Sequence, residues 1–480
     1  MKLYNTLSKS KEEFISLKDK QVNMYVCGVT VYDECHLGHA RAYVSFDVLR
    51  RYLEYQNYEV IYVQNFTDID DKIIAHAKKQ LKEGEDMQVA VKALAKRNID
   101  SYFEVMDALG VKRATTYPKA TDHITHMIAM IEVLIKKGVA YASGGDVFFE
   151  VSKVASYGQL SGKHLEDLRV GERVTIDERK KTPMDFVLWK ASKLGEPSWE
   201  SPWGAGRPGW HIECSAMSFE CFQGTFDIHG GGCDLIFPHH ENEIAQSEAF
   251  TGKTFARYWV HNGFLTINKE KMSKSLGNFF ILKDIFQKFS PESVRLFLLA
   301  AHYRSPIDFS DERLVEAEQQ LQRGYEMLKN VKLALVAGES VKVSSDSREG
   351  LLSIEAKFLA GMDDDCNTAI AIACLFDLIH LANTDLTNGE VHHLGSILSV
   401  FEKISGILFL FQNPPCVVTL NCKVTTDAER RVQGLLNERV SAREGKNWEL
   451  ADALRDEVLG LYSGMNLEDT PSGPVASFWF

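Results

Sequence analysis

The chain carries short apolar runs that are separated by longer segments with a helical pattern. The runs are Met24–Cys27, Glu59–Phe66, Phe226–His229 and Tyr258–His261. Such runs, without apolar–polar alternation, are typical of strands buried on both faces of a parallel sheet. The first run is followed by a helical face made of Tyr43, Phe46, Leu49, Tyr52 and Leu53. This order predicts an α/β fold with a Rossmann-like, doubly wound parallel sheet.

Changes in texture along the chain predict a sheet domain with an insertion, a segment with a basic loop, a helical bundle and a small C-terminal domain. Past Pro291 the pattern is largely helical, and Asn413–Pro415 marks a further boundary. After the insertion, Phe186–Lys190 is expected to return the chain to the parallel sheet. The predicted parts are 1–114, 115–200, 201–260, 261–311, 312–412 and 424–480.

The segment from Met24 to His39 has the pattern of a strand, an irregular loop and a helix start. The first amides of a helix are unpaired and its dipole favours negative charge, so a phosphate group can bind there. His36 and His39 would add two imidazoles, and Gly38 would let a polyphosphate approach the backbone. The alternative is a helix start with two surface histidines, and the segment alone leaves both open.

Further pocket residues are expected where the predicted strands end, because ligands of doubly wound sheets bind at the carboxyl ends of the strands. Thr67 and Asp68 follow the second run and are plausible pocket residues. The alternative is a helix N-terminus with a capping Thr or Asp, and capping is favoured for Asp70 and Asp71. Three glycines, Gly230–Gly232, follow the third run and indicate a close approach of the backbone. The segment 201–213 is rich in Gly, Pro and Trp, which is typical of functional loops.

A possible metal site combines two cysteines, a histidine and a glutamate. His239 and Glu243 are four residues apart and would share one face of a helix. Cys27 ends the first strand and Cys214 opens a later helix, so both are expected near the same sheet edge. Zinc takes sulfur, nitrogen and oxygen ligands from such a set. The alternatives are a buried apolar role for Cys27 and a hydrogen-bonded surface ring for His239.

Composition limits the class of protein. The 480 residues are 45% hydrophobic and 25% charged, which is typical of a soluble globular chain of about three domains. We expect neither a transmembrane helix nor a signal peptide. The nine cysteines are expected to be thiols or metal ligands in a reducing cytoplasm. The net charge of −12 argues against a nonspecific nucleic-acid coat, but a local basic surface could still hold RNA phosphates.

Six segments, in this order, resemble one family. They read MYVCGVTVYDECHLGH, NFTDIDDKI, PMDFVLWK, SPWGAGRPGWHIECSAMS, DIHGGGCDLIFPHHENEIAQSEA and KMSKSLGNFF. The family is that of the cysteinyl-tRNA synthetases, of the class I aminoacyl-tRNA synthetases, and the resemblance covers nearly the whole chain. The HLGH segment (His36–His39), with Leu37 in place of the usual Ile, and the KMSKS segment (Lys271–Ser275) resemble the paired signatures of that class.

The resemblance implies ligation of L-cysteine to tRNA(Cys) in two steps. ATP and cysteine would give cysteinyl-adenylate and pyrophosphate, and the cysteinyl group would then pass to the 3′-terminal adenosine. His36 and His39 would bind phosphate oxygens, and Lys271 and Lys274 would close over the leaving pyrophosphate, with Mg2+ accompanying ATP. The implied ATP-binding residues are Gly28, Thr30, His36, Gly38, His39, Gly230, Lys271, Ser273, Lys274 and Ser275.

The resemblance also implies one Zn2+ per chain, held by Cys27, Cys214, His239 and Glu243. The metal would bind the thiolate of the substrate and reject serine, so that no editing domain would be needed. The implied contacts to the substrate cysteine are Thr67, Trp210 and His229, with core packing as the alternative for Trp210.

In this family the predicted parts would be the two halves of the catalytic domain, a connective insertion, a stem-contact region, a helical bundle and an anticodon-binding domain. Arg439, Arg443 and Trp448 would contact tRNA. We expect a cytoplasmic monomer that does not associate with a membrane. Cys233 replaces a usual Ser and Cys366 a usual Phe, and the tail after Ser472 lacks the usual ending.

Two other functions compete with this interpretation. A ligase of the same ancestry could join cysteine to an amino sugar, but it would need no domain past Pro415. A zinc-stabilised RNA-binding protein with inactive motifs is a second alternative, against which the intact His36, His39, Lys271 and Lys274 argue.

Overall fold

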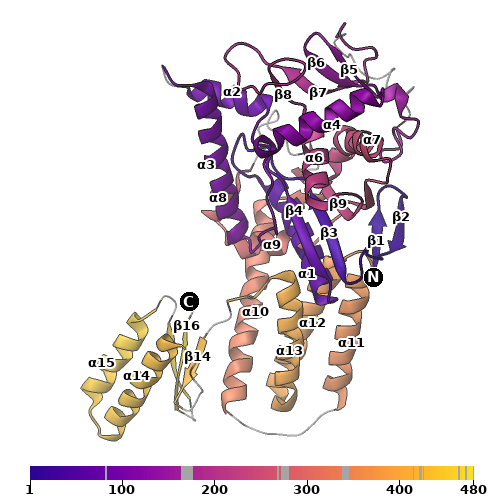
Figure 1. The fold of residues 1–480 in the computed structure, drawn as a ribbon. Coiled ribbons are helices and arrows are strands. Elements are labelled where there is room, and N and C mark those ends of the chain that lie inside the picture. Colours follow the sequence, from indigo (N-terminus) through magenta and orange to yellow (C-terminus); the bar gives the residue numbers. More distant parts are fainter. Residues whose placement is uncertain are drawn as a thin grey trace. The chain divides into compact units, whose positions relative to one another are not determined.

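The computed structural model describes residues 1–81, 84–163, 177–267, 270–271, 280–337, 345–413, 416–420, 424, 426–462, 465–470 and 473–478. The chain forms two compact units (Figure 1). The first contains Met1–Ser310 and Asp363–Cys366, and the second contains Asp311–Met362 and Asn367–Phe480.

The first unit is built around a parallel sheet with the strand order β10–β9–β3–β4. Its strands are β3 (Gln21–Val26), β4 (Glu59–Gln64), β9 (Phe226–Gly232) and β10 (Ala256–Asn262). The chain adds β4 on one side of β3 and later adds β9 and β10 on the other side, so the order reverses between β3 and β9. Ligands of doubly wound sheets bind outside the carboxyl ends of the strands at such a reversal. The predicted α/β fold is confirmed.

The helices of the first unit outside the insertion lie between or after these strands. They are α1 (Leu37–Tyr55), α2 (Asp71–Gln80), α3 (Met87–Ala108), α6 (Trp210–Phe222), η3 (Cys233–Leu235), η4 (Ile236–His240), α7 (Glu241–Thr251), α8 (Leu282–Phe286) and α9 (Pro291–Leu299). His36 and His39 form a reciprocal capping box that begins α1. Asp70 caps α2 by accepting a hydrogen bond from the amide of Lys72, so the capping interpretation holds at this position.

The insertion carries its own antiparallel sheet, in the order β5–β6–β7–β8. Its elements are η1 (Ala120–His123), α4 (Ile124–Lys136), β5 (Ala140–Ser143), β6 (Asp146–Phe149), η2 (Val151–Lys153), β7 (Phe186–Ala191) and β8 (Gly206–Pro208). The expectation that Phe186–Lys190 returns to the parallel sheet was wrong, because this run forms β7 between β6 and β8. The antiparallel sheet also extends to Pro208, past the predicted end of the insertion.

Two smaller sheets complete the first unit. The N-terminal hairpin pairs β1 (Lys2–Asn5) with β2 (Ser10–Glu13). The other sheet has the order β12–β11–β13, made of β11 (Leu265–Ile267), β12 (Glu270–Lys271) and β13 (Ile307–Phe309). Because β12 ends at Lys271, this sheet carries the first residue of the KMSKS segment.

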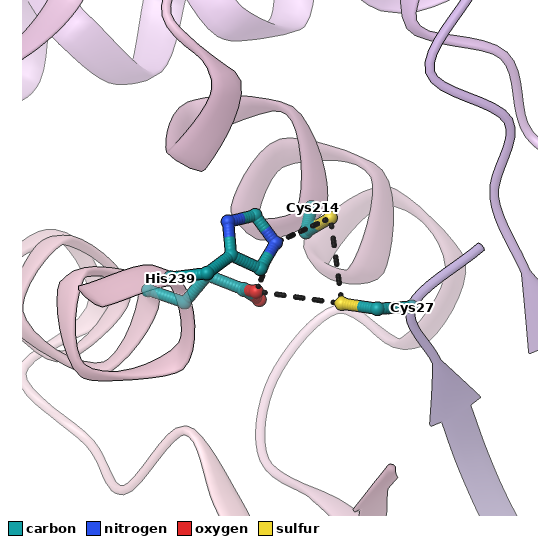
Figure 2. A group of neighbouring side chains, drawn as sticks. Cys27, Cys214 and His239 are labelled. Atoms are coloured by element: carbon teal, nitrogen blue, oxygen red, sulfur yellow. Dashed lines mark hydrogen bonds and ion pairs between the residues drawn. The ribbon is translucent and has the colours of Figure 1, made fainter. Parts of the chain in front are cut away.

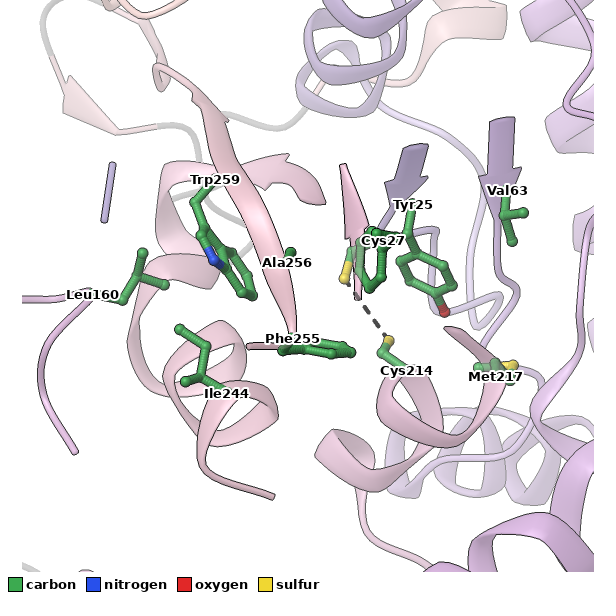
Figure 3. Packing of buried hydrophobic residues seen from close by; sticks show 11 residues of the cluster. Tyr25, Cys27, Val63, Leu160, Cys214, Met217, Ile244, Phe255, Ala256 and Trp259 are labelled. Atoms are coloured by element: carbon green, nitrogen blue, oxygen red, sulfur yellow. Dashed lines mark hydrogen bonds between the residues drawn. The ribbon is translucent and has the colours of Figure 1, made fainter. Parts of the chain in front are cut away.

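An apolar cluster packs around the carboxyl half of the parallel sheet (Figure 3). It includes Tyr25, Val63, Met217, Ile244, Phe255 and Trp259. Cys27 and Cys214 belong to the same cluster, and their sulfur atoms point toward one another. The two thiols are therefore enclosed by apolar side chains and shielded from water.

The second unit begins with a helical bundle and ends with a small α/β part. The helices of the bundle are α10 (Asp311–Ala337), α11 (Ser345–Asp363), α12 (Thr368–Asn388), η6 (Val391–His393) and α13 (Leu394–Leu408). The C-terminal part consists of β14 (Cys416–Thr419), α14 (Asp427–Glu444), α15 (Trp448–Gly460), β15 (Asn466–Thr470) and β16 (Gly473–Phe478). Its sheet is antiparallel, in the order β14–β16–β15, and the sequence pattern did not predict it.

Among the described residues, α12 is long and apolar enough to cross a membrane by length and composition alone. The helix packs against α10 and α13 of the bundle. The core helix of a bundle passes the same test, so this observation is weak evidence for a membrane span.

Candidate metal centre and active site

Cys27, Cys214, His239 and Glu243 converge at the end of β3 (Figure 2). Cys27 directly follows β3, Cys214 lies in α6, His239 in η4 and Glu243 in α7. All are buried, and their ligand atoms lie within 4.8 Å of one another. The predicted metal set is thus brought together by three segments that are far apart in sequence.

The distances in this cluster fit a tetrahedral metal. The Cys27 and Cys214 sulfurs are 3.8 Å apart, Cys214 Sγ lies 3.5 Å from His239 Nε2, and Cys27 Sγ lies 3.6 Å from Glu243 Oε1. With the usual zinc bond lengths, a tetrahedron places such pairs roughly 3.8, 3.5 and 3.6 Å apart. The His239–Glu243 separation is shorter, at 2.9 Å, and would open by roughly 0.4 Å around a metal.

A second set, Cys27, His229, His240 and Glu243, also meets the distance criterion for a metal site. It would leave Cys214 and His239 unused beside the metal. In the first set His229 has a supporting role, because its Nε2 donates to Glu243 Oε2 at 2.8 Å while Oε1 faces the sulfur of Cys27. Hydrogen bonds of this kind orient metal ligands. The first set therefore accounts for more of the buried groups.

The ring of His239 is fixed from its far side. His239 Nδ1 lies 2.8 Å from His211 Nδ1, which leaves Nε2 directed toward Cys214. Burial, and then the neighbouring His239, lower the pKa of His211 far below its ordinary value, so His211 is neutral and accepts this hydrogen bond. Trp210 stacks on His239 with ring centroids 4.1 Å apart.

Protonation of the cluster is set by the closeness of its members. Burial opposes ionisation of Glu243, but His229 and His239 hold its pKa at about 2. Burial likewise opposes the charged form of His239, yet Glu243 and Cys214 raise its pKa to about 10. The hydrogen bond from Cys27 lowers the pKa of Cys214 to about 6. The negative charges of Glu243 and Cys214 are thus balanced by a proton on His239, which a metal ion would displace.

The HLGH segment lies at the start of α1 and follows Cys27 closely in the sequence. The rings of His36 and His39 are stacked, with centroids 3.6 Å apart. The backbone of Leu37 donates to Phe280 O, and Leu282 donates to Cys35 O. The stretch that follows the KMSKS segment is therefore paired with the start of the HLGH segment. The amides of Leu37 and His39 are also paired within the chain, with Phe280 O and with the His36 ring, so the helix dipole is what this start offers an anion.

Two of the predicted glycines have a packing reason. A Cβ on Gly28 would lie 1.6 Å from the carbonyl oxygen of Asn65, so only glycine fits between the ends of β3 and β4. A Cβ on Gly230 would lie 2.5 Å from the ring of Phe46 in α1. For Gly230, the structure thus supplies a cause other than the approach of a ligand. Thr30 pairs with Thr67 in an isolated bridge across the same strand ends.

The three residues predicted to contact the substrate cysteine differ in their position relative to the metal cluster. Thr67 donates to Glu213 Oε2 at 2.8 Å. Trp210 is 39% exposed and stacks on the candidate ligand His239, so it is not a simple core residue. His229 is fully buried behind Glu243 and stacks on Trp259. Thr67 and Trp210 therefore border the cluster, whereas His229 supports it.

The remaining predicted residues fall in two regions. Lys271 is described only as backbone, in β12, and Ser273, Lys274 and Ser275 lie outside the described residues. Arg439 is 6% exposed and forms a two-pronged ion pair with Asp469. Arg443 pairs with the same carboxylate, while Trp448 is 59% exposed.

The sequence pattern did not single out His211, Glu213, His240 and His261. His240 Nδ1 lies 2.8 Å from His261 Nε2, and His240 Nε2 lies 3.3 Å from the Cys27 sulfur. Their closeness in sequence to Cys214 and His239 was the only available signal. It does not reveal which ring faces which neighbour.

Comparisons with known proteins agree with this geometry. Residues 13–319 match the family model "tRNA synthetases class I (C) catalytic domain", and residues 357–412 match a DALR domain. A cysteine–tRNA ligase of Carboxydothermus hydrogenoformans is 50% identical over 98% of this chain and 99% of its own length. A cysteine–tRNA ligase of Thermodesulfovibrio yellowstonii is 48% identical over 99% of both chains. This chain belongs to the cysteine–tRNA ligase family.

The fold is shared more widely. A solved structure of Mycobacterium tuberculosis methionyl-tRNA synthetase, in complex with methionyl-adenylate, superposes with a TM-score of 0.58 at 18% identity, over 81% of this chain and 87% of that chain. The DALR match lies in the helical bundle, from the last turns of α11 through α12 to just past the end of α13.

As a cysteine–tRNA ligase, the enzyme activates cysteine with ATP, releases pyrophosphate and transfers the cysteinyl group to tRNA. The carboxylate of cysteine attacks the α-phosphorus, so little covalent chemistry falls to the protein. Positioning of the reactants and stabilisation of the developing charge supply the rate. The amino-sugar ligase and the inactive RNA-binding protein are both excluded by the family.

The His211–His239 contact predicts that His211→Phe lowers the affinity for a metal by about 10-fold to 100-fold, because a ligand ring would lose the acceptor that orients it. Competition with a chromogenic chelator measures this affinity. His126→Phe is the matched control, since His126 is half-exposed and its contacts are with Glu220 and the ring of His123, away from the cluster. Equal affinities in the two variants would contradict the assigned role of His211.

Proposed function

We propose that this ligase holds one Zn2+ with Cys27, Cys214, His239 and Glu243, and that the zinc selects cysteine. The observation that carries the proposal is the S2NO ligand set, whose separations match a tetrahedral zinc. The ligands are buried and already oriented by His211 and His229. When bound, the metal would supply a soft Lewis acid for the thiolate of the substrate, which serine does not have.

The chain's own residues around the cluster would position the substrate. Trp210 stacks on His239 and is partly exposed, so it offers an apolar wall next to the ligand. Thr67, which follows β4, and its partner Glu213 in α6 would offer polar groups for the amino end of cysteine. His229 acts through Glu243, as a positioning residue.

ATP would bind along the strand ends and the start of α1. His36, Gly38 and His39 present a helix N-terminus to the phosphates, with Gly28 and Thr30 on the strand side. Gly230 belongs to this site only as the residue that lets α1 pack closely on β9. Lys271, Ser273, Lys274 and Ser275 would bind the leaving pyrophosphate, and Mg2+ would accompany ATP.

The C-terminal part of the second unit would contact tRNA(Cys). Trp448 begins α15 and is exposed, as an aromatic platform for a base would be. Arg439 holds Asp469, and Arg443 shares that carboxylate, so Arg443 is the more available of the two for a phosphate. The enzyme would act as a monomer in the cytoplasm, away from membranes. The described cysteines are free thiols, in keeping with a reducing compartment.

The zinc proposal predicts about one zinc per chain in the purified ligase. After substitution by cobalt, a sulfur-to-metal charge-transfer band should grow when cysteine is added and stay constant when serine is added, because only a thiolate adds a sulfur ligand. A spectrum that ignores cysteine in active cobalt enzyme would assign the metal a purely structural role.

Lys274→Ala should slow cysteine-dependent ATP–pyrophosphate exchange by about 100-fold or more, because its charge matters most as pyrophosphate separates. The KM for cysteine should change little. Lys78→Ala, on the exposed face of α2, is the control that removes an equivalent charge elsewhere. A normal exchange rate in Lys274→Ala would remove this lysine from the mechanism.

Trp448→Ala should lower kcat/KM for tRNA charging by about 10-fold, since stacking of one base contributes about 1–3 kcal/mol. Pyrophosphate exchange should stay normal because it needs no tRNA. Val89→Ala removes an equally exposed apolar side chain from α3 and serves as control. Normal charging by Trp448→Ala would take this residue out of the tRNA site.

A further inference from the structure

Arg41 is a buried arginine in α1, two positions beyond the HLGH segment. Its side chain is 1% exposed. The guanidinium donates to a group of carbonyl oxygens at the end of α9 and in the turn 300–305 that follows. These carbonyls belong to Leu298, Ala301, His302, Tyr303 and Ser305. One side chain thus forms hydrogen bonds with carbonyl oxygens along the whole turn.

The partners of Arg41 are neutral. No carboxylate among the described residues forms an ion pair with it, and burial lowers the pKa of its guanidinium to about 10. The carbonyls at a helix C-terminus carry partial negative charge, which offsets the cost of burying a cation there. A rigid fork of donors fits such an arrangement better than the single ammonium of lysine would. The arrangement fixes the turn relative to α1 with several directional bonds.

The turn 300–305 leads directly into the sheet that carries Lys271. After the turn, β13 pairs in parallel with β11, with Leu265 opposite Ile307. Strand β11 in turn pairs with β12, with Thr266 opposite Lys271. Gly263, just before β11, donates to Tyr303 O at 2.8 Å, and a Cβ there would lie 2.5 Å from Arg304 O. The turn therefore determines where the strands leading to Lys271 begin.

The turn is also held independently of Arg41. Asp365 is fully buried and accepts hydrogen bonds from the Tyr303 hydroxyl at 2.7 Å and from Arg304 Nε at 2.6 Å. It also accepts from the Tyr4 amide at 2.8 Å. Loss of Arg41 would thus remove its own bonds between α1 and the turn, while Asp365 keeps the shape of the turn and the Arg295–Asp47 ion pair still joins α9 to α1.

We propose that Arg41 is a positioning residue for adenylate formation, because it fixes the turn 300–305, and with it strands β11 and β12, relative to the HLGH segment. Arg41 itself touches no substrate. It sets the position of Lys271 relative to His36 and His39, which begin the helix that carries Arg41. The inference rests on the proposed role of Lys271 in binding the leaving pyrophosphate.

The test is steady-state ATP–pyrophosphate exchange by full-length Arg41→Met and Arg41→Lys ligase. For Arg41→Met, kcat per active site should fall by about 100-fold, the cost of a shift of about 1 Å between catalytic groups. The KM for ATP should rise, while the KM for cysteine and the zinc content stay as in the wild type, because the zinc cluster lies at other strand ends. For Arg41→Lys, the fall in kcat and the rise in the KM for ATP should be smaller, since lysine keeps the charge without the fork of donors.

The matched control is Arg50→Met. Arg50 is another buried arginine of α1 and donates to a carbonyl oxygen, that of Arg113. Among the described residues, it forms no hydrogen bond or ion pair with the turn 300–305. Active-site titration by the first turnover corrects every rate for unfolded protein. If Arg50→Met raises the KM for ATP as Arg41→Met does, or if both Arg41 variants keep wild-type kinetic constants, the proposal is overturned. Should Arg41→Met not fold, the result of Arg41→Lys decides in the same way.

Lys271→Ala in the same assay separates this proposal from the one on which it rests. Normal exchange by Lys271→Ala would refute the role of that lysine, and the positioning role with it. Slow exchange by Lys271→Ala together with normal exchange by Arg41→Met and Arg41→Lys would refute the role of Arg41 alone.

Discussion

The first unit depends on balancing negative charge in a space closed to water. Cys27, Cys214 and Glu243 can all ionise, and their ligand atoms lie within 4.8 Å of one another. Burying one anion without a partner is costly, and burying several together is more costly still. A positive charge must therefore lie among them, either as a proton on His239 or as a metal ion. Because the ligands come from β3, α6, η4 and α7, this balance also holds the carboxyl edge of the parallel sheet to the helices that follow it.

The parallel sheet could be predicted because its strands are buried on both faces. Such strands need continuous apolar runs, and the chain supplies them at Met24–Cys27 and at the other predicted runs. The same reasoning misplaced Phe186–Lys190, since an apolar run does not reveal which sheet it joins. It missed β15, Asn466–Thr470, which is polar except for Leu467 and lies at an edge of its sheet. Pairing with β16 forms that strand, and local sequence carries little trace of such pairing.

The candidate site was predicted as a set of residues more fully than as a geometry. The four candidate metal ligands were inferred from their kinds and from strand ends, and the structure brings them together. The surrounding histidines were missed because their roles depend on ring orientation, which only the fold fixes. Gly230 shows the same limit of prediction from sequence. A glycine needed for packing on Phe46 cannot be distinguished, in the sequence, from one needed for the approach of a ligand.

Long-range closure explains why the metal cluster and the fold are coupled. Cys27 and Cys214 are separated by 187 positions, so their sulfur atoms meet only after the insertion is enclosed between the two halves of the sheet. The entropy of closing such a loop is lost before any contact within the cluster repays it. A cation that joins both sulfurs to His239 and Glu243 binds the folded chain and not the unfolded one, and its binding free energy adds to that of folding. The same atoms that would select the substrate would thus also join distant segments at the carboxyl edge of the sheet, which would tie selectivity for cysteine to the stability of the catalytic unit.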